Sequence, residues 1–456
     1  MKKIITYISS ICIILSSCSE YLDLKPDDAI STPETLEDLE AMLSYESKMN
    51  ENYCGLVEIG SDDYQLVRSV FDGRTVFERD NFKWENHPLY LQLDMGENWQ
   101  RPYEAILYSN IVLESLERIR EGDITLRNKI RGDALFVRAY RFFNLAQAFS
   151  PVYDPSVENS NLGIPLRLSS DVSEKTIRST VKETYDQILS DLKESADLLP
   201  EKVGNKTRPD KAAAYALLSR VLLSMQNYEG ALEAATKCLA LNSTLIDYNN
   251  IDLAKAFPFP PLNSETLYYG KCPISLLLPT RADVSLELYE KYEDNDLRKK
   301  AFFSMRTPQR VRFKGYYSGG STGYFAGIAI DEVYLNAAEC NIRLGKLKQG
   351  LNLLNNLLKN RYDRGAYVEK FANNETEALR ILLEERRKEL PFRGTRWTDI
   401  RRLNLDSRFA TNIRHTIYGT NGENVETFEL APNDNRFVFL IPQSIIELTG
   451  IPQNKR

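Results

Sequence analysis

The chain has 456 residues, of which 43% are hydrophobic, and its formal net charge is −6 at pH 7. A chain of this length can bury a large core and has room for two or three domains of roughly 150 residues. The acidic balance is not offset by a basic patch or tail, so it disfavours nucleic acid and anionic surfaces as partners.

The first eighteen residues resemble a bacterial lipoprotein signal peptide. Lys2 and Lys3 precede an apolar run that closes on Leu15-Ser16-Ser17-Cys18. The run is shorter than the roughly 20 residues of a membrane-spanning helix, so we expect cleavage of residues 1–17 and lipid attachment at Cys18. Two or more acyl chains would hold the protein on a membrane stably without a spanning helix. The alternative is a buried helix that happens to end in a cysteine.

The residues after Cys18 indicate which membrane carries the protein. The acidic segment 19–23, Ser-Glu-Tyr-Leu-Asp, resembles the surface-export signals of Bacteroidetes lipoproteins. We therefore expect the protein at the outer face of the cell outer membrane. Cleavage would remove two lysines and no acidic residue, which moves the net charge from −6 to −8.

Cysteine and histidine are too sparse for familiar catalytic or metal sites. Besides Cys18, the mature chain would keep four cysteines without CxxC spacing, which we expect to be mostly buried thiols: Cys54, Cys238, Cys272 and Cys340. His87 and His415 are the two histidines, and we expect both in loops or on the surface. A histidine metal site or a histidine-based triad is disfavoured, and we predict no required metal or cofactor.

Helical periodicity dominates from Trp99 to Lys359. Apolar residues recur at three- and four-residue steps over 99–113 and again over 134–146, which predicts an antiparallel helix pair. Thr180 is placed to cap a third helix, which should end before Pro200.

Two later segments resemble tetratricopeptide repeats. Residues 212–239 carry small residues where two helices must approach closely, and residues 331–358 repeat the layout with Gly345 at the end of the first helix. Gly350 stands where that repeat usually has alanine. One such helix pair cannot bury its apolar face, so several pairs should stack into a helical layer, and the repeated residues are mainly core.

Two loop-rich stretches, about 50–95 and 248–328, interrupt the helical pattern. Both are rich in aromatic residues, and long aromatic loops in a compact domain are usually functional. We therefore look there for a binding surface, with these candidates: Trp84, Tyr90, Tyr316, Tyr317 and Tyr324. The alternative for each is ordinary loop packing, because surface aromatics are common.

The segment 383–403, LEERRKELPFRGTRWTDIRRL, resembles the signature of the SusD-like (RagB/SusD) family of nutrient-binding outer-membrane lipoproteins. Further matching segments cover nearly the whole mature sequence, and residues 31–64 resemble one SusD-like subgroup. Arg393 departs from the glutamate that many members carry. The resemblance implies a mostly α fold, with residues 18–456 forming a single SusD-like domain. Tetratricopeptide-like helix pairs would form a layer, with long loops and a few short strands.

The signature itself has a structural interpretation. Its leucines, with Leu379 and Leu382, can face the core, while the charged residues 384–389 offer ion pairs on the opposite face. Trp397 can pack beneath the helix, with Asp399 paired to Arg396. The alternative is a carboxylate pair for glycoside hydrolysis, which needs two side chains about 5–10 Å apart on either side of a sugar. Neighbouring glutamates on one salt-bridged helix rarely satisfy that geometry.

The resemblance implies non-catalytic binding of oligosaccharide or polysaccharide nutrients at the cell surface and delivery to a SusC-like TonB-dependent transporter. Sugar rings present apolar faces to aromatic rings while their hydroxyl groups need polar partners, so a glycan site should combine both. Peptide capture, as in the RagB-like branch, is the main alternative; a glycoside hydrolase and a repeat-type adaptor are the others. Asp294-Asn295-Asp296 could contact calcium, but it lacks the glycine and distal glutamate of an EF-hand.

Overall fold

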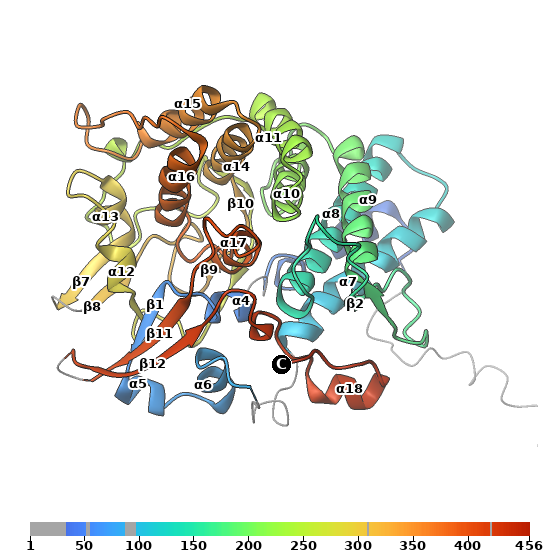
Figure 1. The fold of residues 1–456 in the computed structure, drawn as a ribbon. Coiled ribbons are helices and arrows are strands. Elements are labelled where there is room, and N and C mark those ends of the chain that lie inside the picture. Colours follow the sequence, from blue (N-terminus) through green and yellow to red (C-terminus); the bar gives the residue numbers. More distant parts are fainter. Residues whose placement is uncertain (1–32, 52–54, 87–96, 308–309, 420–421) are drawn as a thin grey trace, which may run out of the picture.

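The structure is a computed structural model that describes residues 33–51, 55–86, 97–307, 310–419 and 422–456. The predictions for the signal segment 1–17, Cys18, Cys54, His87 and Tyr90 lie outside these residues. The predicted mostly α fold is confirmed, and Figure 1 shows helices over most of the molecule, with short strands in several separate places.

The predicted helices near the start of the helical region are present. The helix α7 (Glu97–Arg118) turns back through 119–123 into α8 (Ile124–Phe149), which packs against both α7 and α9 (Val181–Leu198). Thr180 caps α9 as expected, because its hydroxyl accepts from the Glu183 amide while the Glu183 carboxylate accepts from the Thr180 amide.

Both predicted repeat pairs are also present. The pair α10 (Lys211–Ser224) and α11 (Tyr228–Leu241) packs against the pair α14 (Ile330–Arg343) and α15 (Leu347–Leu358), which completes a layer of stacked helices in Figure 1. Gly345 has a φ of +74°, the left-handed conformation expected at a helix end. At Gly350, an added Cβ would lie 2.5 Å from Cγ1 of Ile342, so the departure from alanine has a packing reason.

The signature forms α16 (Glu375–Glu389) and α17 (Arg396–Leu403). The C-terminal region adds α18 (Gln443–Thr449), which ends at Gly450 with a φ of +70°. Shorter helices come from the N-terminal part and from the second loop-rich stretch: α2 (Leu36–Leu43), α3 (Glu46–Met49), α4 (Gly55–Ile59), α5 (Arg68–Asp72), α6 (Val76–Phe82), α12 (Leu286–Tyr289) and α13 (Leu297–Phe302).

Strands are short and pair mostly across long stretches of sequence. The largest sheet has the order β12-β11-β1-β6, in which β1 runs parallel to β11 and the other neighbours are antiparallel. Its strands are β1 (Tyr64–Val67), β6 (Asp283–Val284), β11 (Ile413–Tyr418) and β12 (Asn424–Leu430). Four two-stranded pairs are β2 (Leu162–Pro165) with β3 (Arg178–Thr180), β4 (Thr266–Tyr268) with β10 (Ile328–Ala329), β5 (Lys271–Cys272) with β9 (Tyr324–Phe325), and β7 (Phe303–Thr307) with β8 (Arg310–Phe313).

The two loop-rich stretches therefore contain more regular structure than expected. Their strands pair with distant partners, such as Leu66 with Ile417, and a local sequence pattern cannot show such a pairing. Most of their described aromatic side chains join the same buried cluster as the residues of α7, α8 and α10. The predicted burial of Cys238, Cys272 and Cys340 is confirmed.

Candidate functional site

The described aromatic candidates are core residues. Trp84, Tyr316, Tyr317 and Tyr324 are at most 3% exposed. The Trp84 ring stacks on His415 with the centroids 4.2 Å apart, and the Tyr317 hydroxyl donates to Glu265 at 2.7 Å. The structure favours the alternative of loop packing for these four candidates, because the loops are long enough to bury their own aromatic side chains and to supply polar partners inside the protein.

His415 is also buried, contrary to the expectation of a loop or surface residue. It lies on β11 with its ring between Phe82 and Trp84, and its two nitrogens lie 2.6 Å from the carbonyl oxygens of Phe82 and Ser61. Burial lowers the pKa of His415. It joins β11 to α6 and to the segment that follows α4 rather than facing solvent.

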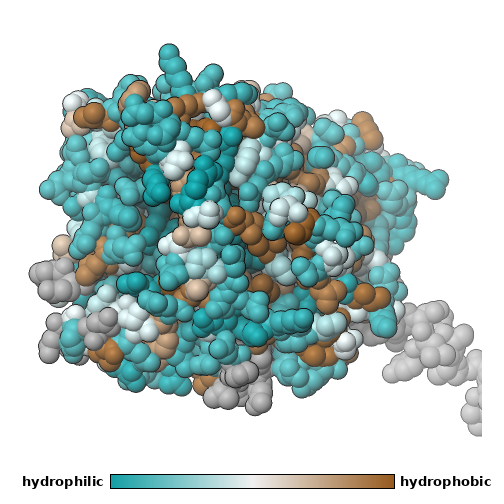
Figure 2. All heavy atoms as spheres, viewed as in Figure 1, coloured by the Kyte–Doolittle hydropathy of each residue, from teal (hydrophilic) through white to brown (hydrophobic). Residues whose placement is uncertain are grey.

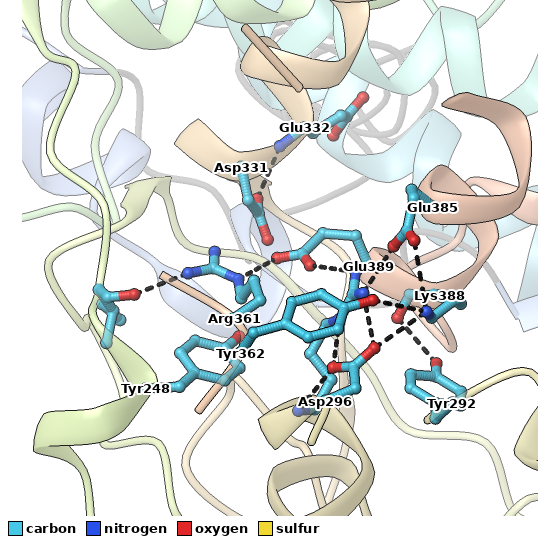
Figure 3. Close-up of polar contacts among 12 residues, drawn as sticks. Tyr248, Tyr292, Asp296, Asp331, Glu332, Arg361, Tyr362, Glu385, Lys388 and Glu389 are labelled. Carbon is cyan, nitrogen blue, oxygen red and sulfur yellow. Dashed lines mark hydrogen bonds and ion pairs between the residues drawn. The ribbon is translucent and has the colours of Figure 1, made fainter. Parts of the chain in front are cut away.

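The charged face of the signature helix is buried as well. Figure 3 shows Glu385, Lys388 and Glu389 pointing into a network with Arg361 and Asp296. The Glu389 carboxylate accepts from Arg361 at 2.7 Å and from Arg298 at 3.1 Å. The predicted ion pairs are present, but residues 385, 386, 388 and 389 are buried. Glu385 and Glu389 pair with arginines of other elements, whereas Arg386 and Lys388 pair with the carboxylates of Asp399 and Asp296.

Trp397 and Asp399 of the signature were also predicted to have particular contacts. Trp397 is fully buried, as predicted. Asp399 is paired with Arg386 at 2.7 Å and with Arg402, whereas Arg396 binds Asp62 at 2.6 Å. The predicted Asp399–Arg396 pair is wrong, because Arg396 turns to Asp62 while Asp399 pairs with Arg386 of α16 and with Arg402 one turn further along α17.

Sequence reasoning missed a hollow of about 370 Å³ between α7, the β2–β3 hairpin and α18, the region at the lower right of Figure 1. We call it the Trp99–Tyr103 hollow. Apolar residues are combined there with side chains that can donate or accept hydrogen bonds. The lining comprises Trp99, Gln100, Tyr103, Glu104, Leu107, Asn110, Pro165, Arg167, Ser169, Val172, Thr176, Ile445 and Thr449.

Hydrogen bonds fix the shape of this hollow. The Trp99 and Tyr103 rings lie 5.1 Å apart, and the Tyr103 hydroxyl donates to the Pro165 carbonyl at 2.8 Å. The Asn110 amide donates to the carbonyls of Arg167 and Ser169 at 3.0 and 3.1 Å, which holds the hairpin segment against α7. In the sequence, the four-residue spacing of Trp99 and Tyr103 indicates a buried helix face. Only their position in the first turns of α7 could have suggested that this face is partly open to solvent.

A second, more polar hollow of about 630 Å³ is lined by residues of the same hairpin and of the C-terminal segment. Arg178 and Arg401 line it together with polar residues near the C-terminus, and we call it the Arg178–Arg401 hollow. Arg178 anchors the C-terminal segment, because its guanidinium donates to the Pro452 carbonyl at 2.9 Å and to the Asn454 side chain at 2.8 Å.

Exposed apolar side chains surround these hollows. Val172 and Ile177 in the hairpin loop and Leu448 on α18 are each more than 60% exposed. We call these three residues the apolar rim. In Figure 2, brown patches interrupt the hydrophilic surface in the region where Figure 1 places α7, β2 and α18.

Within the described part of the chain, no group of three or more histidine, cysteine, aspartate or glutamate side chains is placed to hold a metal ion. In the segment considered for calcium, Asp296 pairs with Arg298 at 2.7 Å and Asp294 pairs with Lys299 at 2.8 Å. Both carboxylates are thus engaged by cations of the protein.

Two family models match the chain. One, described as "Starch-binding associating with outer membrane", covers residues 20–223, and one described as "SusD family" covers residues 290–453. The second range contains the signature segment. The chain belongs to the SusD-like family, as the sequence resemblance indicated.

Two curated relatives are also SusD-like proteins. SusD-like protein P38 of Formosa agariphila is 24% identical over 272 residues, which are 57% of this chain and 48% of that protein. SusD-like protein P2 of the same organism is 26% identical over 139 residues, which are 30% of this chain and 25% of that protein. The chain thus spans about half of the first relative and a quarter of the second.

Solved structures share the fold over nearly their full length. A putative sugar binding protein from Bacteroides vulgatus has a TM-score of 0.76 at 21% identity, with 93% of this chain and 99% of that chain covered. Surface glycan-binding protein A from Bacteroides fluxus has a TM-score of 0.69 at 17% identity, with 92% and 99% covered. Among the residues that the structure describes, no helix is both long and apolar enough to cross a membrane.

Proposed function

We propose that this protein binds oligosaccharide or polysaccharide nutrients at the outer face of the outer membrane and delivers them to a SusC-like TonB-dependent transporter. It would do so without cleaving them. The observation that carries the proposal is the Trp99–Tyr103 hollow, which combines ring surface with amide, carboxylate and guanidinium groups around one concavity. That combination suits sugars, whose rings are apolar on their faces and carry hydroxyl groups around the edge.

The family and its structures support this class of ligand. One matching model is described as starch-binding, and two structural neighbours are named for sugar or glycan binding. The lipoprotein-like segment that ends at Cys18 supports attachment to the outer membrane through acyl chains. Labelled palmitate should therefore enter the full-length protein, and Cys18→Ser should abolish the incorporation.

The non-catalytic part of the proposal is supported by the state of the signature glutamates. Glu389 is buried and ion-paired to two arginines, whereas the Glu384 side chain is 55% exposed and pairs with Lys291 at 3.7 Å. The two carboxylates lie in different environments, one inside the protein and one at its surface. A glycosidase pair would need both to face one sugar.

Calorimetry on the soluble form, begun after Cys18, would test the ligand class with a panel of glycans and peptides. We expect a glycan to bind, and we expect Tyr103→Leu and Gln100→Ala to weaken its binding about tenfold, because stacking and hydrogen-bonding groups are worth about 1–3 kcal/mol. Phe371→Ala is the matched control, since Phe371 is an exposed aromatic outside the hollow. Binding of peptides alone would replace the proposal with RagB-like peptide capture.

Prolonged incubation with the bound glycan should leave it uncut, and shortened products would contradict a purely binding role. Delivery is tested separately by purification from the native membrane. Copurification of an outer-membrane barrel protein would support delivery, and its absence under mild detergent would argue for a free-standing binding protein.

A further inference from the structure

The Arg178–Arg401 hollow carries an excess of positive charge, although the whole chain is acidic. Arg178, Arg401 and Lys455 line it, and Asp434 is its one acidic lining residue. The Asp434 carboxylate is already paired, because it accepts from Arg436 at 2.8 and 3.0 Å. The hollow therefore presents cations whose charge is not balanced by its own walls.

Arg401 differs from the other buried arginines of the signature region. Arg386, Arg393 and Arg402 each form an ion pair with a carboxylate. Arg401 is 3% exposed, and the acceptors of its guanidinium are the carbonyls of Gln147 and Ser150 and the Gln147 side chain. Because no carboxylate pairs with it, burial lowers the pKa of Arg401 to about 10. An unpaired buried charge is costly, and an anion nearby would offset the cost.

Arg178 is likewise a buried arginine without a carboxylate partner. It is 6% exposed, and its five hydrogen bonds go to carbonyls and to the Asn454 amide oxygen. Burial lowers its pKa to about 10 as well. Two guanidinium groups without a carboxylate partner thus line one hollow, together with Gln453 and Asn454 of the C-terminal segment.

Unused donors lie in the same wall. Arg401 Nε and Asn404 Nδ2 are buried and have no hydrogen-bond partner. The Asn404 amide is oriented by its own oxygen, which accepts from the Thr411 amide at 3.2 Å, so its NH₂ group is the unpaired side. Buried donors are nearly always paired in folded proteins, so these two point to an acceptor that the protein itself does not supply.

We propose that the Arg178–Arg401 hollow binds the anionic group of an acidic sugar residue, so that the ligand is a charged glycan. The inference rests on the proposed function and narrows its ligand class. Uronate carboxylates and sulfate esters share the required chemistry, since both accept charge-assisted hydrogen bonds from guanidinium and amide donors. The two hollows share the β2–β3 hairpin, because Arg178 lines one of them and its partner across the strands, Pro165, lines the other.

The test is calorimetry with charged glycans and their neutral counterparts. Oligogalacturonate is compared with its carboxyl-reduced form, a sulfated galactan oligosaccharide is compared with its desulfated form, and malto-oligosaccharide serves as a neutral reference. We expect one charged form to bind about tenfold or more tightly than its neutral counterpart, as expected for charge-assisted hydrogen bonds. The carboxylate and sulfate arms tell which group is preferred.

Variants at the edge of the hollow test whether the charged group binds there. Asn435 and Lys455 are exposed lining residues, so Asn435→Asp and Lys455→Glu should fold normally and should each weaken binding of the charged form about fivefold or more, through repulsion of like charges. Arg401→Gln should weaken it further. Asn352→Asp on α15 adds the same charge at an exposed position outside the hollow and should change nothing.

The outcomes separate this inference from the proposed function. If neutral glycans bind and Tyr103→Leu weakens them, while charged forms gain nothing and Asn435→Asp has no effect, the acidic-sugar site is wrong and glycan binding stands. If no glycan binds in either form, both fail. If the affinity for the charged form is the same in Asn435→Asp, Lys455→Glu and Arg401→Gln as in the parent protein, the anion binds elsewhere and the inference is overturned.

Discussion

Glu58 is a buried carboxyl group without a cation to balance it. It lies on α4 and is 1% exposed; the Gly394 amide donates to Oε2 at 2.8 Å, and Oε1 has no partner. Burial, with help from the nearby Asp63, raises the pKa of Glu58 to about 8. The native state therefore keeps the proton at pH values where the unfolded state has lost it.

The sign of the pH effect follows from that difference. Between the unfolded pKa and about pH 8, the native state binds more protons than the unfolded state, so rising pH lowers the free energy of unfolding. Glu58→Gln mimics the protonated form, and we expect it to raise that free energy by about 2–4 kcal/mol at pH 8.5 and by almost nothing at about pH 4. Urea unfolding at both pH values measures this, and an equal effect at the two pH values would contradict the assignment.

Glu384 and Glu389 of the signature should differ sharply in their contribution to stability. Glu389→Gln leaves Arg298 and Arg361 without their shared partner, and breaking a buried network of this kind costs about 3–5 kcal/mol. Glu384→Gln removes a largely exposed contact with Lys291 and should change stability by less than about 0.5 kcal/mol. Denaturant midpoints of the two variants give the comparison.

Single residues were the hardest features to predict from the sequence. The aromatic content of the two loop-rich stretches was visible, but whether Trp84 or Tyr317 faces water depends on neighbours such as His415 and Glu265, which are distant in sequence. Arg178 and Arg401 likewise have ordinary sequence surroundings. The lack of a carboxylate partner is a property of the assembled core.

Elements were predicted better than residues, because helical signals are local. The cap at Thr180, the end at Gly345 and the apolar spacing of α7 and α8 each depend on residues within a few turns. A few short strands were predicted as part of the fold class, but their positions were not, since most are short and several pair with distant partners: Tyr64 pairs with Val284, and Leu66 pairs with Ile417. Alternation of apolar and polar residues over only three or four positions is too short to predict a strand.

The departure at Gly350 makes a prediction about how α14 and α15 approach each other. A Cβ at this position would lie 2.5 Å from Cγ1 of Ile342 and 2.7 Å from the Ala338 carbonyl oxygen, and the latter cannot move without shifting α14. We expect Gly350→Ala to destabilise the protein by about 1–3 kcal/mol despite the better helix propensity of alanine. Gly204→Ala is the control, because nothing lies within 4 Å of its added Cβ.

At the scale of the whole molecule, the N-terminal and C-terminal parts are joined by charge. Asp62 accepts from Arg396 at 2.6 Å and from Arg387 at 3.2 Å, and Asp63 accepts from Arg387 at 3.0 Å. The two arginines hold the pKa of Asp62 well below its usual value. The early SDDY segment and the signature, which looked like separate matches in the sequence, therefore form one structural unit, with β1 and β11 paired beside it.

The apolar rim gives a prediction about the partner. Val172, Ile177 and Leu448 are exposed beside the Trp99–Tyr103 hollow, and exposed apolar groups gathered around a binding hollow are typical of a surface that another protein covers. If a transporter receives the glycan from this hollow, its barrel must approach this side of the molecule. The rim would then be buried in the complex.

Val172→Asp combined with Leu448→Asp should therefore reduce copurification of an outer-membrane barrel protein at least about tenfold, because each charge would be desolvated in the contact. Val368→Asp combined with Phe371→Asp is the matched control, since both residues are equally exposed and lie between α15 and α16, at the opposite end of Figure 1 from α18. The single variant Leu448→Asp should keep the glycan affinity of the isolated protein within about twofold of the parent value, because Leu448 is exposed and does not line the hollow, whereas Val172 does. Its effect on copurification therefore separates partner contact from glycan binding. If only the control pair loses copurification, the transporter contacts the helical layer and not the apolar rim. A glycan in the Trp99–Tyr103 hollow would then face away from the barrel.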